Sequence, residues 1–464
     1  MPNKSVLFVS LFSVSLILAL IGFTAVPDTY GSRVDGTGPA GPQRTYDKGS
    51  VSMYYEYDQP AVLARQDQRI ILRVGARALR RAKDDERLPL NVAIVLDKSG
   101  SMRSQNKIEH AKQGAIDMLS YLDEDDIVSV VIFADYAQIV VPAGPLTDKA
   151  GVVRTIQSIR ADGSTALYSG ISLGAREVAR HASSDYLNRI VLLSDGLANV
   201  GPQSNAEIFR LAENFMGDGV HCSAIGVGLD FNEQLLSGLA ENSGGNYYYA
   251  RNGDDLPGIF EREVSRSTTV IAKDIRIKVY AANGSRLAGV IGPATEQSPR
   301  VAETWIPFLY GGDDKYRLIE LDLPRLAPGD GRQVAQLTIE YFDPVHHITQ
   351  SVDVPLRLDV TTDERLVSRR QNTGVIKDAY LRRMAERKQE AVAYARRGDY
   401  RGASRILVQT SVELESAAEK YKDDDLYRAS RQNRWQSQKV LQDQEYDREL
   451  MNSEIMNINQ EFWG

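Results

Sequence analysis

The chain has 464 residues, of which 42% are hydrophobic and 25% are charged, and its formal net charge is −7. This length exceeds what one hydrophobic core supports and indicates roughly two to four domains in a soluble globular protein. The mild negative charge excludes the clustered basic face that is typical of nucleic-acid-binding proteins. The single cysteine, Cys222, excludes an intrachain disulfide framework and a cysteine metal cluster, and its apolar neighbours predict a buried strand residue.

The N-terminus is typical of an exported protein. Lys4 precedes an uncharged apolar run over residues 6–26, and a basic start before such a run is the pattern of an export signal. The run is also long enough to cross a bilayer. Two interpretations of residues 1–27 therefore stay open. A cleaved signal peptide predicts a periplasmic or extracellular protein, and a retained transmembrane anchor predicts a protein in the inner membrane that faces the periplasm.

Two segments separate this N-terminus from the first domain. Residues 28–48 are rich in glycine and proline and lack hydrophobic periodicity, which predicts a flexible linker. Residues 49–88 regain alternation in "SVSMYYEY" and "QRIILRV", which predicts short strands. These strands are too few to fold alone, so we expect them to join a larger β domain.

Residues 89–266 alternate between predicted strands and helices. The run "NVAIVL" is continuously apolar, as in a strand that is covered on both faces. Further strands are expected in "IVSVVIF", "AQIVV", "RIVLL", "VHCSAIGVG" and "NYYYA", with amphipathic helices between them. Such alternation predicts an α/β fold, a doubly wound and mainly parallel Rossmann-like sheet with helices on both faces.

Residues 267–362 contain only predicted strands with turn residues between them, which indicates a β-sandwich domain. In a doubly wound domain the first strand starts at the lower edge of the sheet, and the last helix ends there. We therefore expect the strands of residues 49–88 to pair with this sandwich.

Residues 365–450 are predicted to be helical, with a hairpin whose turn lies at Gly398 and an N-cap for a third helix at Asp423 to Asp425. Arginines such as Arg382 interleave with acidic residues on the first helix, which predicts a solvated face. The polar tail, residues 451–464, is expected to be loosely ordered.

Oxygen-bearing side chains follow the first strand of the α/β domain. The strand "NVAIVL" ends in "DKSGSM", which contains Asp97, Ser99 and Ser101. Ligands bind at the carboxyl ends of the strands in an open parallel sheet, and carboxylate and hydroxyl oxygens suit hard cations such as Mg²⁺ or Ca²⁺. Taken alone, this motif is better explained by helix capping.

Two further segments favour a metal site over capping. "DGSTAL" places Thr165 in a loop before a helix, and "IVLLSDG" ends another apolar strand with Asp195. Two facing carboxylates repel each other unless a cation lies between them. The set "DKSGSM", "GSTAL" and "LLSDG" resembles the von Willebrand factor type A domain and its metal-ion-dependent adhesion site. The flanking arrangement also resembles exported bacterial type A proteins and the inter-alpha-trypsin inhibitor heavy chains.

The resemblance implies a function as well as a fold. It implies that Asp97, Ser99, Ser101, Thr165 and Asp195 hold Mg²⁺, or Ca²⁺ or Mn²⁺ in its place, directly or through water. It further implies that an acidic side chain of a protein partner completes the coordination, as in an adhesion or assembly module. The membrane is a second partner only if the N-terminal segment is retained, and no nucleic-acid partner is expected.

Two alternatives stay open beside adhesion. The first is a regulatory subunit of a membrane complex in which the metal has a structural role. The second is a metal-dependent hydrolase, for which Asp135 is the nearest candidate base, although a loop aspartate after a strand is usually a turn former. The chain lacks the H-E-x-x-H and G-K-[ST] motifs. It also lacks a G-x-S-x-G elbow between a strand and a helix, because its G-x-S-x-G run over residues 170–174 falls within a predicted helix. We therefore expect a protein that is not an enzyme.

Overall fold

The computed structural model describes residues 43–79, 88–195, 199–228, 231–250, 253–267, 270–292 and 294–442. The predicted export segment and the polar tail both lie outside these residues. None of the described helices is both long enough and apolar enough to cross a membrane.

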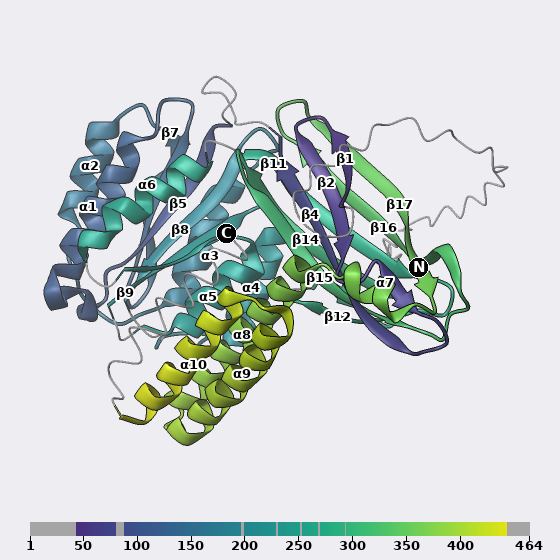
Figure 1. The fold of residues 1–464 in the computed structure, drawn as a ribbon. Coiled ribbons are helices and arrows are strands. Elements are labelled where there is room, and N and C mark those ends of the chain that lie inside the picture. The colour runs from purple at the N-terminus through teal and green to yellow at the C-terminus, as the bar shows by residue number, and fades with distance from the viewer. Residues whose placement is uncertain are drawn as a thin grey trace, which may run out of the picture. The chain divides into compact units, whose positions relative to one another are not determined.

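A six-stranded sheet forms the centre of the α/β domain (Figure 1), with the strand order β10-β9-β8-β5-β6-β7. The strands are β5 Leu90–Asp97, β6 Ile127–Phe133, β7 Ala137–Pro145, β8 Leu187–Ser194, β9 His221–Val227 and β10 Tyr247–Ala250. All neighbours run parallel except β7, which pairs antiparallel with β6. The predicted doubly wound, mainly parallel sheet is therefore confirmed.

Helices cover both faces of this sheet because its strands are apolar on both sides. They are α1 Lys107–Ser120, α2 Lys149–Ser158, α3 Leu167–Ala179, α4 Asn205–Gly217, α5 Glu233–Ser243 and α6 Leu256–Ser267, with short 3-10 turns at Gly100–Asn106 and Gly253–Asp255. Successive residues of β5 enter opposite cores, since Ile94 packs in the α1, α2 and α6 layer and Val95 in the α3 to α5 layer. Cys222 is fully buried in β9, as predicted.

Two further sheets enclose a second core that contains residues of both, so the predicted β-sandwich is confirmed. The five-stranded sheet has the order β1-β2-β4-β15-β12, and the six-stranded sheet has the order β13-β14-β11-β16-β17-β3. The strands are β1 Arg44–Lys48, β2 Val51–Tyr57, β3 Ala61–Leu63, β4 Gln68–Ala78, β11 Val270–Ala281, β12 Arg286–Ile291, β13 Glu296–Gln297, β14 Val301–Tyr310, β15 Asp314–Leu323, β16 Gly329–Asp343 and β17 Ile348–Thr361. The expected pairing of the two flanks is confirmed, because β4 pairs with β15 and β3 with β17.

The predicted linker over residues 28–48 is wrong at its C-terminal end. Residues 44–48 form β1, which pairs antiparallel with β2 in the sandwich. The ring of Tyr46 stacks on that of Tyr55 with 6.4 Å between the centroids. A five-residue edge strand is too short to show periodicity in the sequence, so only its partner strand reveals it.

Four helices end the described chain: α7 Glu364–Arg369, α8 Thr373–Arg396, α9 Tyr400–Tyr421 and α10 Asp424–Gln442. The hairpin of α8 and α9 turns at Gly398, whose φ of +81° favours glycine. The predicted cap of a third helix is confirmed, since the Asp423 carboxylate accepts from the backbone N–H of Leu426 at 2.9 Å. The hairpin is thus extended by α10, which packs along α9 (Figure 1).

The prediction that the α8 arginines form a solvated face is wrong for Arg382. Its side chain is among the largest fully buried ones, and burial lowers its pKa to about 10. Glu241 of α5 is one of the acidic groups whose charge acts on it. Burial also raises the pKa of Glu241 to about 7, although the charge of Arg382 opposes the shift. The helix α8 therefore buries this charged residue and does not expose it to solvent.

We predict that Glu241 makes the stability of the folded protein fall as the pH rises. Its folded pKa is about 7 and its ordinary value is 4.5, so the folded state holds a proton that the unfolded state releases between these values. The contribution of Glu241 to the free energy of unfolding is fully present below pH 4.5 and is lost as the pH rises through 7. Between pH 5 and pH 8 the free energy of unfolding should fall by about 2 kcal/mol more in the wild type than in Glu241→Gln. Urea unfolding of both proteins at the two pH values measures this difference. Parallel pH profiles of the two proteins would contradict this.

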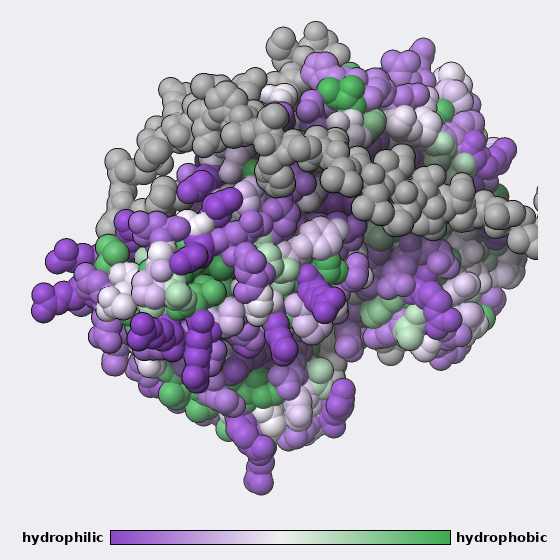
Figure 2. Space-filling view, turned by 90° about the vertical axis from the view of Figure 1, so that its right-hand side faces the viewer, coloured by the Kyte–Doolittle hydropathy of each residue, from purple (hydrophilic) through white to green (hydrophobic). Residues whose placement is uncertain are grey.

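Figure 2 shows one face of the molecule, on which hydrophilic side chains dominate and hydrophobic ones occur in small separate groups. Such scattered apolar residues are ordinary for a soluble surface.

Candidate metal centre

The carboxyl ends of β5 and β8 bring two aspartates to one edge of the sheet. The strands are parallel neighbours with Leu96 opposite Leu193, so Asp97 and Asp195 each lie at the end of adjacent strands. Both are buried, with exposures of 0% and 2%. The sequence predicted this edge because strands that alternate with helices all end on the same side.

A continuous chain of hydrogen bonds joins four of the five predicted residues. Asp97 accepts from the backbone N–H of Ser99 at 2.8 Å and from the Ser194 hydroxyl at 2.6 Å. The hydroxyls of Ser99 and Ser101 lie 3.0 Å apart, and the Ser101 hydroxyl donates to Asp195 at 2.7 Å. Ser101 is exposed while the other three are buried. The site therefore opens to solvent on the side of Ser101.

The fifth residue, Thr165, lies in a loop that is held against the first. The carbonyl of Gly163 accepts from the backbone N–H of Gly100 at 2.9 Å. The backbone N–H of Thr165 donates to the Asn199 side chain at 2.7 Å, and its carbonyl accepts from the backbone N–H of Asn199 at 3.1 Å. Thr165 is only 3% exposed. Three loops from distant parts of the chain thus meet at this edge.

The electrostatics of these side chains fit a hard cation. Burial, with a smaller contribution from the charge of Asp195, raises the pKa of Asp97 to about 6, although hydrogen bonds from Ser194 and Ser99 oppose the shift. The other groups of the chain therefore do not fully offset the cost of burying the ionised Asp97 carboxylate, and a bound cation would stabilise this ionised form. The donors are carboxylates and hydroxyls, which Mg²⁺ and Ca²⁺ prefer. No group of three or more His, Cys, Asp or Glu side chains suited to a metal occurs among the described residues.

Sequence reasoning missed three residues that support this arrangement. Ser194 directly precedes Asp195 in the sequence, and Asn199 follows it four residues later; both bind the predicted residues as described above. Lys107 begins α1, and its ammonium lies 2.7 Å from the second carboxylate oxygen of Asp195. Ser194 and Asn199 stand within the "LLSDGLANVG" motif and could have been noted. Nothing in the sequence shows that Lys107 turns inward.

Residues beside the site have structural roles. Asp135 is exposed, and its carboxylate accepts from the backbone N–H of Ser164 at 2.8 Å. That hydrogen bond holds the pKa of Asp135 below its ordinary value, which makes it a weaker base. Met102 is fully buried and packs in the core between β5 and α1.

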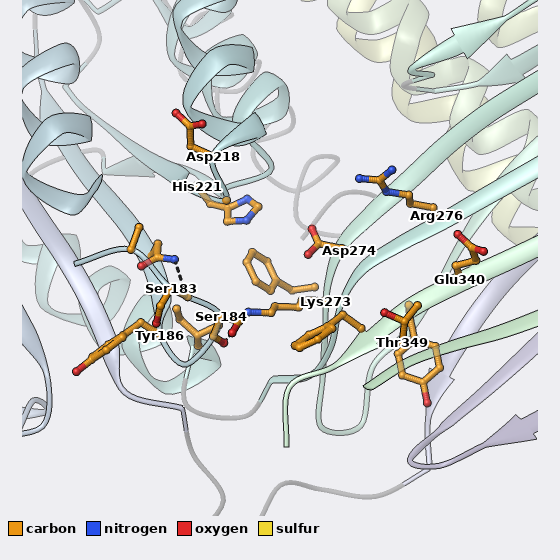
Figure 3. A pocket seen from close by; sticks show the side chains of 17 residues that line it. Ser183, Ser184, Tyr186, Asp218, His221, Lys273, Asp274, Arg276, Glu340 and Thr349 are labelled. Atoms are coloured by element: carbon orange, nitrogen blue, oxygen red, sulfur yellow. Dashed lines mark hydrogen bonds between the residues drawn. The ribbon is translucent and has the colours of Figure 1, made fainter. Parts of the chain in front are cut away.

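A cleft of about 530 Å³ lies elsewhere (Figure 3). It is lined by β11 and β16 of the sandwich and by the loops before β8 and β9, and carries cations and carboxylates together, such as Lys273 and Asp218. His221 lies at its wall, where burial lowers its pKa to about 3 and its ring nitrogen contacts the Ser243 carbonyl at 2.8 Å. This histidine is therefore neutral at ordinary pH, and the mixed charges select no class of ligand.

Residues 91–262 match the family model of the von Willebrand factor type A domain, a range that contains all five candidate residues. The relative named "Uncharacterized protein sll0103", from Synechocystis sp., is 27% identical over 336 residues, which cover 70% of this chain and 78% of the relative. Inter-alpha-trypsin inhibitor heavy chain H3 of Homo sapiens is 29% identical over 169 residues, which cover 34% of this chain but only 18% of that protein. The resemblance to the von Willebrand factor type A domain is thereby confirmed.

The solved structure of a von Willebrand factor type A protein from Catenulispora acidiphila has a similar fold. Its TM-score is 0.64 at 17% identity, over 82% of this chain and 91% of that chain. At this identity the likeness concerns the fold alone. Domains of this type are typically protein-interaction modules, and some of them depend on a metal.

Proposed function

Because residues 91–262 of this chain are a von Willebrand factor type A domain, we propose that the protein is an exported, metal-dependent adhesion or assembly module. In this proposal Asp97, Ser99, Ser101, Thr165 and Asp195 hold a divalent cation, Mg²⁺ or else Ca²⁺ or Mn²⁺, that binds a carboxylate of a partner protein. The observation that carries it is the unbroken chain of oxygen ligands from Asp97 to Asp195, which is buried at both ends and exposed at Ser101.

The composition of the site supports carboxylate capture. Mg²⁺ prefers six oxygens and commonly retains exchangeable water. Hydroxyls are neutral, so a cation held by them keeps more of its positive charge than one held by carboxylates alone. Of the donors described, three are hydroxyls and two are carboxylates, and one hydroxyl, that of Ser101, faces solvent. The cation would therefore attract an acidic side chain that approaches from outside.

Export rests on the N-terminal sequence. The apolar run over residues 6–26 follows a lysine, and it serves either as a cleaved signal or as an anchor in the inner membrane. The two alternative functions have less support. For a hydrolase, the hydrogen bond and lowered pKa of Asp135 weaken its only proposed base. For a regulatory subunit, the metal would stabilise the fold without contacting a partner.

The test of this function combines metal binding with carboxylate recognition. Isothermal titration of the purified chain with MgCl₂ and MnCl₂ should show one binding site. Resin that displays glutamate side chains should then retain the protein in Mg²⁺ and release it in EDTA, while matched resin with glutamine should not retain it. Binding of the metal without retention would favour a structural metal, and the absence of metal binding would overturn the proposal.

A further inference from the structure

The candidate metal centre contains a cation that belongs to the chain itself. The Lys107 ammonium lies 2.7 Å from a carboxylate oxygen of Asp195, and the two side chains are 9% and 0% exposed. The other oxygen of Asp195 accepts from the Ser101 hydroxyl at 2.7 Å. A buried ion pair therefore lies directly beside the residues that would hold the metal.

The backbone places Lys107 there against local preference. Gln105 and Asn106, the two residues before it, are both left-handed, with φ of +52° and +56°. This conformation is unfavourable for residues other than glycine. Lys107 is then the first residue of α1, where the helix dipole disfavours a positive charge. The ion pair with Asp195 offsets the cost of the left-handed backbone and the cost of a positive charge at the start of α1. The local backbone conformation thus places the Lys107 ammonium beside Asp195.

The space around the ammonium is also fitted to it. A Cβ atom at Gly228 would lie only 3.1 Å from the Lys107 nitrogen, and the φ of Gly228 is +83°. The loop after β9 therefore passes close to the ammonium without a side chain. Arg103, in the turn before α1, is by contrast an exposed cation that pairs with Asp162 at 3.3 Å. Lys107 is the buried cation of the centre among the described residues.

We propose that Lys107 sets the charge of the metal centre so that the loaded site attracts a carboxylate. This inference rests on the proposed function. Asp97 and Asp195 together with Lys107 carry one net negative charge, which a divalent cation converts to one net positive charge. Without Lys107 the cation and the two aspartates would be neutral, and the attraction for an acidic side chain would be lost. In the metal-free protein the Lys107 ammonium is the counter-ion of the buried Asp195 carboxylate.

Two opposite effects follow from removing this charge. The affinity for the metal should rise, because Lys107 repels the cation through a partly buried medium of low effective dielectric constant. The affinity of the loaded site for a carboxylate should fall for the same electrostatic reason. If Lys107 only stabilised the fold, its removal would not raise the affinity for the metal and lower the affinity for the carboxylate.

The experiment compares Lys107→Met and Lys107→Gln with the wild type in the full chain. Titration calorimetry with MnCl₂ should show affinities for both variants at least about tenfold tighter than that of the wild type. Retention of the Mg²⁺-loaded protein on glutamate resin should decrease in both. Thermal unfolding in EDTA should occur at a lower temperature than for the wild type, and saturating Mg²⁺ should remove most of that difference. Lys107→Gln, which keeps a hydrogen-bond donor, guards against a failure of Lys107→Met to fold.

Lys112→Met is the matched control on the same helix. Lys112 is also buried, but its ammonium binds Glu109 at 2.9 Å and not a residue of the centre. This variant removes the same charge and should leave the affinity for Mn²⁺ unchanged. Equal Mn²⁺ affinities in the wild type and both Lys107 variants would overturn the inference while the proposed function stands. A wild type that binds no metal would overturn both.

Discussion

Replacing Glu263 with glutamine should lower the free energy of unfolding by about 3 to 5 kcal/mol, because it removes one partner of a fully buried ion pair. The Glu263 carboxylate on α6 lies 3.1 Å from the Arg189 guanidinium, and both side chains are 1% exposed. Arg189 also donates to the Tyr310 hydroxyl of β14 at 2.7 Å. The pair therefore links the α/β domain to the sandwich.

The cost is large because Glu263 satisfies several groups at once. Its carboxylate also accepts from Ser223 at 2.6 Å, from Asn246 at 2.9 Å and from Tyr248 at 2.7 Å. Burial opposes its ionisation, but Arg189 and these hydrogen bonds outweigh burial and hold the pKa of Glu263 below its ordinary value. A neutral glutamine would leave the Arg189 charge buried without its counter-ion.

Urea unfolding followed by circular dichroism measures this effect. Asp322→Asn is the matched control, since Asp322 pairs with Arg69 at 2.7 Å but both side chains are about half exposed, at 45% and 52%. An exposed pair contributes at most about 1 kcal/mol. A similar small loss in both variants would mean that the buried pair has little net effect on stability.

The second large effect concerns Asp97. The variant Asp97→Asn should reduce the affinity for Mg²⁺ at least about 100-fold, since even residues that only orient metal ligands cost 10- to 100-fold when changed. The fold should survive, because the asparagine oxygen can still accept from the backbone N–H of Ser99. In EDTA the variant should be at least as stable as the wild type, since burial and the charge of Asp195 already disfavour an ionised Asp97.

Titration calorimetry with MgCl₂ and thermal unfolding in EDTA measure the two parts of this prediction. Asp135→Asn is the control, because Asp135 is an exposed carboxylate at the same edge that is not one of the five proposed ligands. Its affinity for Mg²⁺ should equal that of the wild type. If Asp97→Asn binds Mg²⁺ as the wild type does, Asp97 is no ligand and the proposed centre is wrong.

The sequence alone determined the α/β fold and the position of the candidate site. Strands such as β5 bury every residue, and all of these strands except β6 are followed by a helix, so the pattern along the sequence implies a doubly wound sheet. The carboxyl ends of such strands meet at one edge of the sheet, so the sequence places Asp97 and Asp195 there. These conclusions depend on local patterns and on general rules of sheet topology.

Only the tertiary structure decided which charged residues lie inside. Lys107, Arg189 and Arg382 look like ordinary surface cations in the sequence, yet all three are buried. Lys107 and Arg189 are held by partners far along the chain, Asp195 for Lys107 and Glu263 for Arg189. The edge strand β1 was missed for a similar reason, because its hydrogen bonds depend on β2. Local propensity carries no information about a distant counter-ion or a neighbouring strand, and these contacts exist only once the chain has folded.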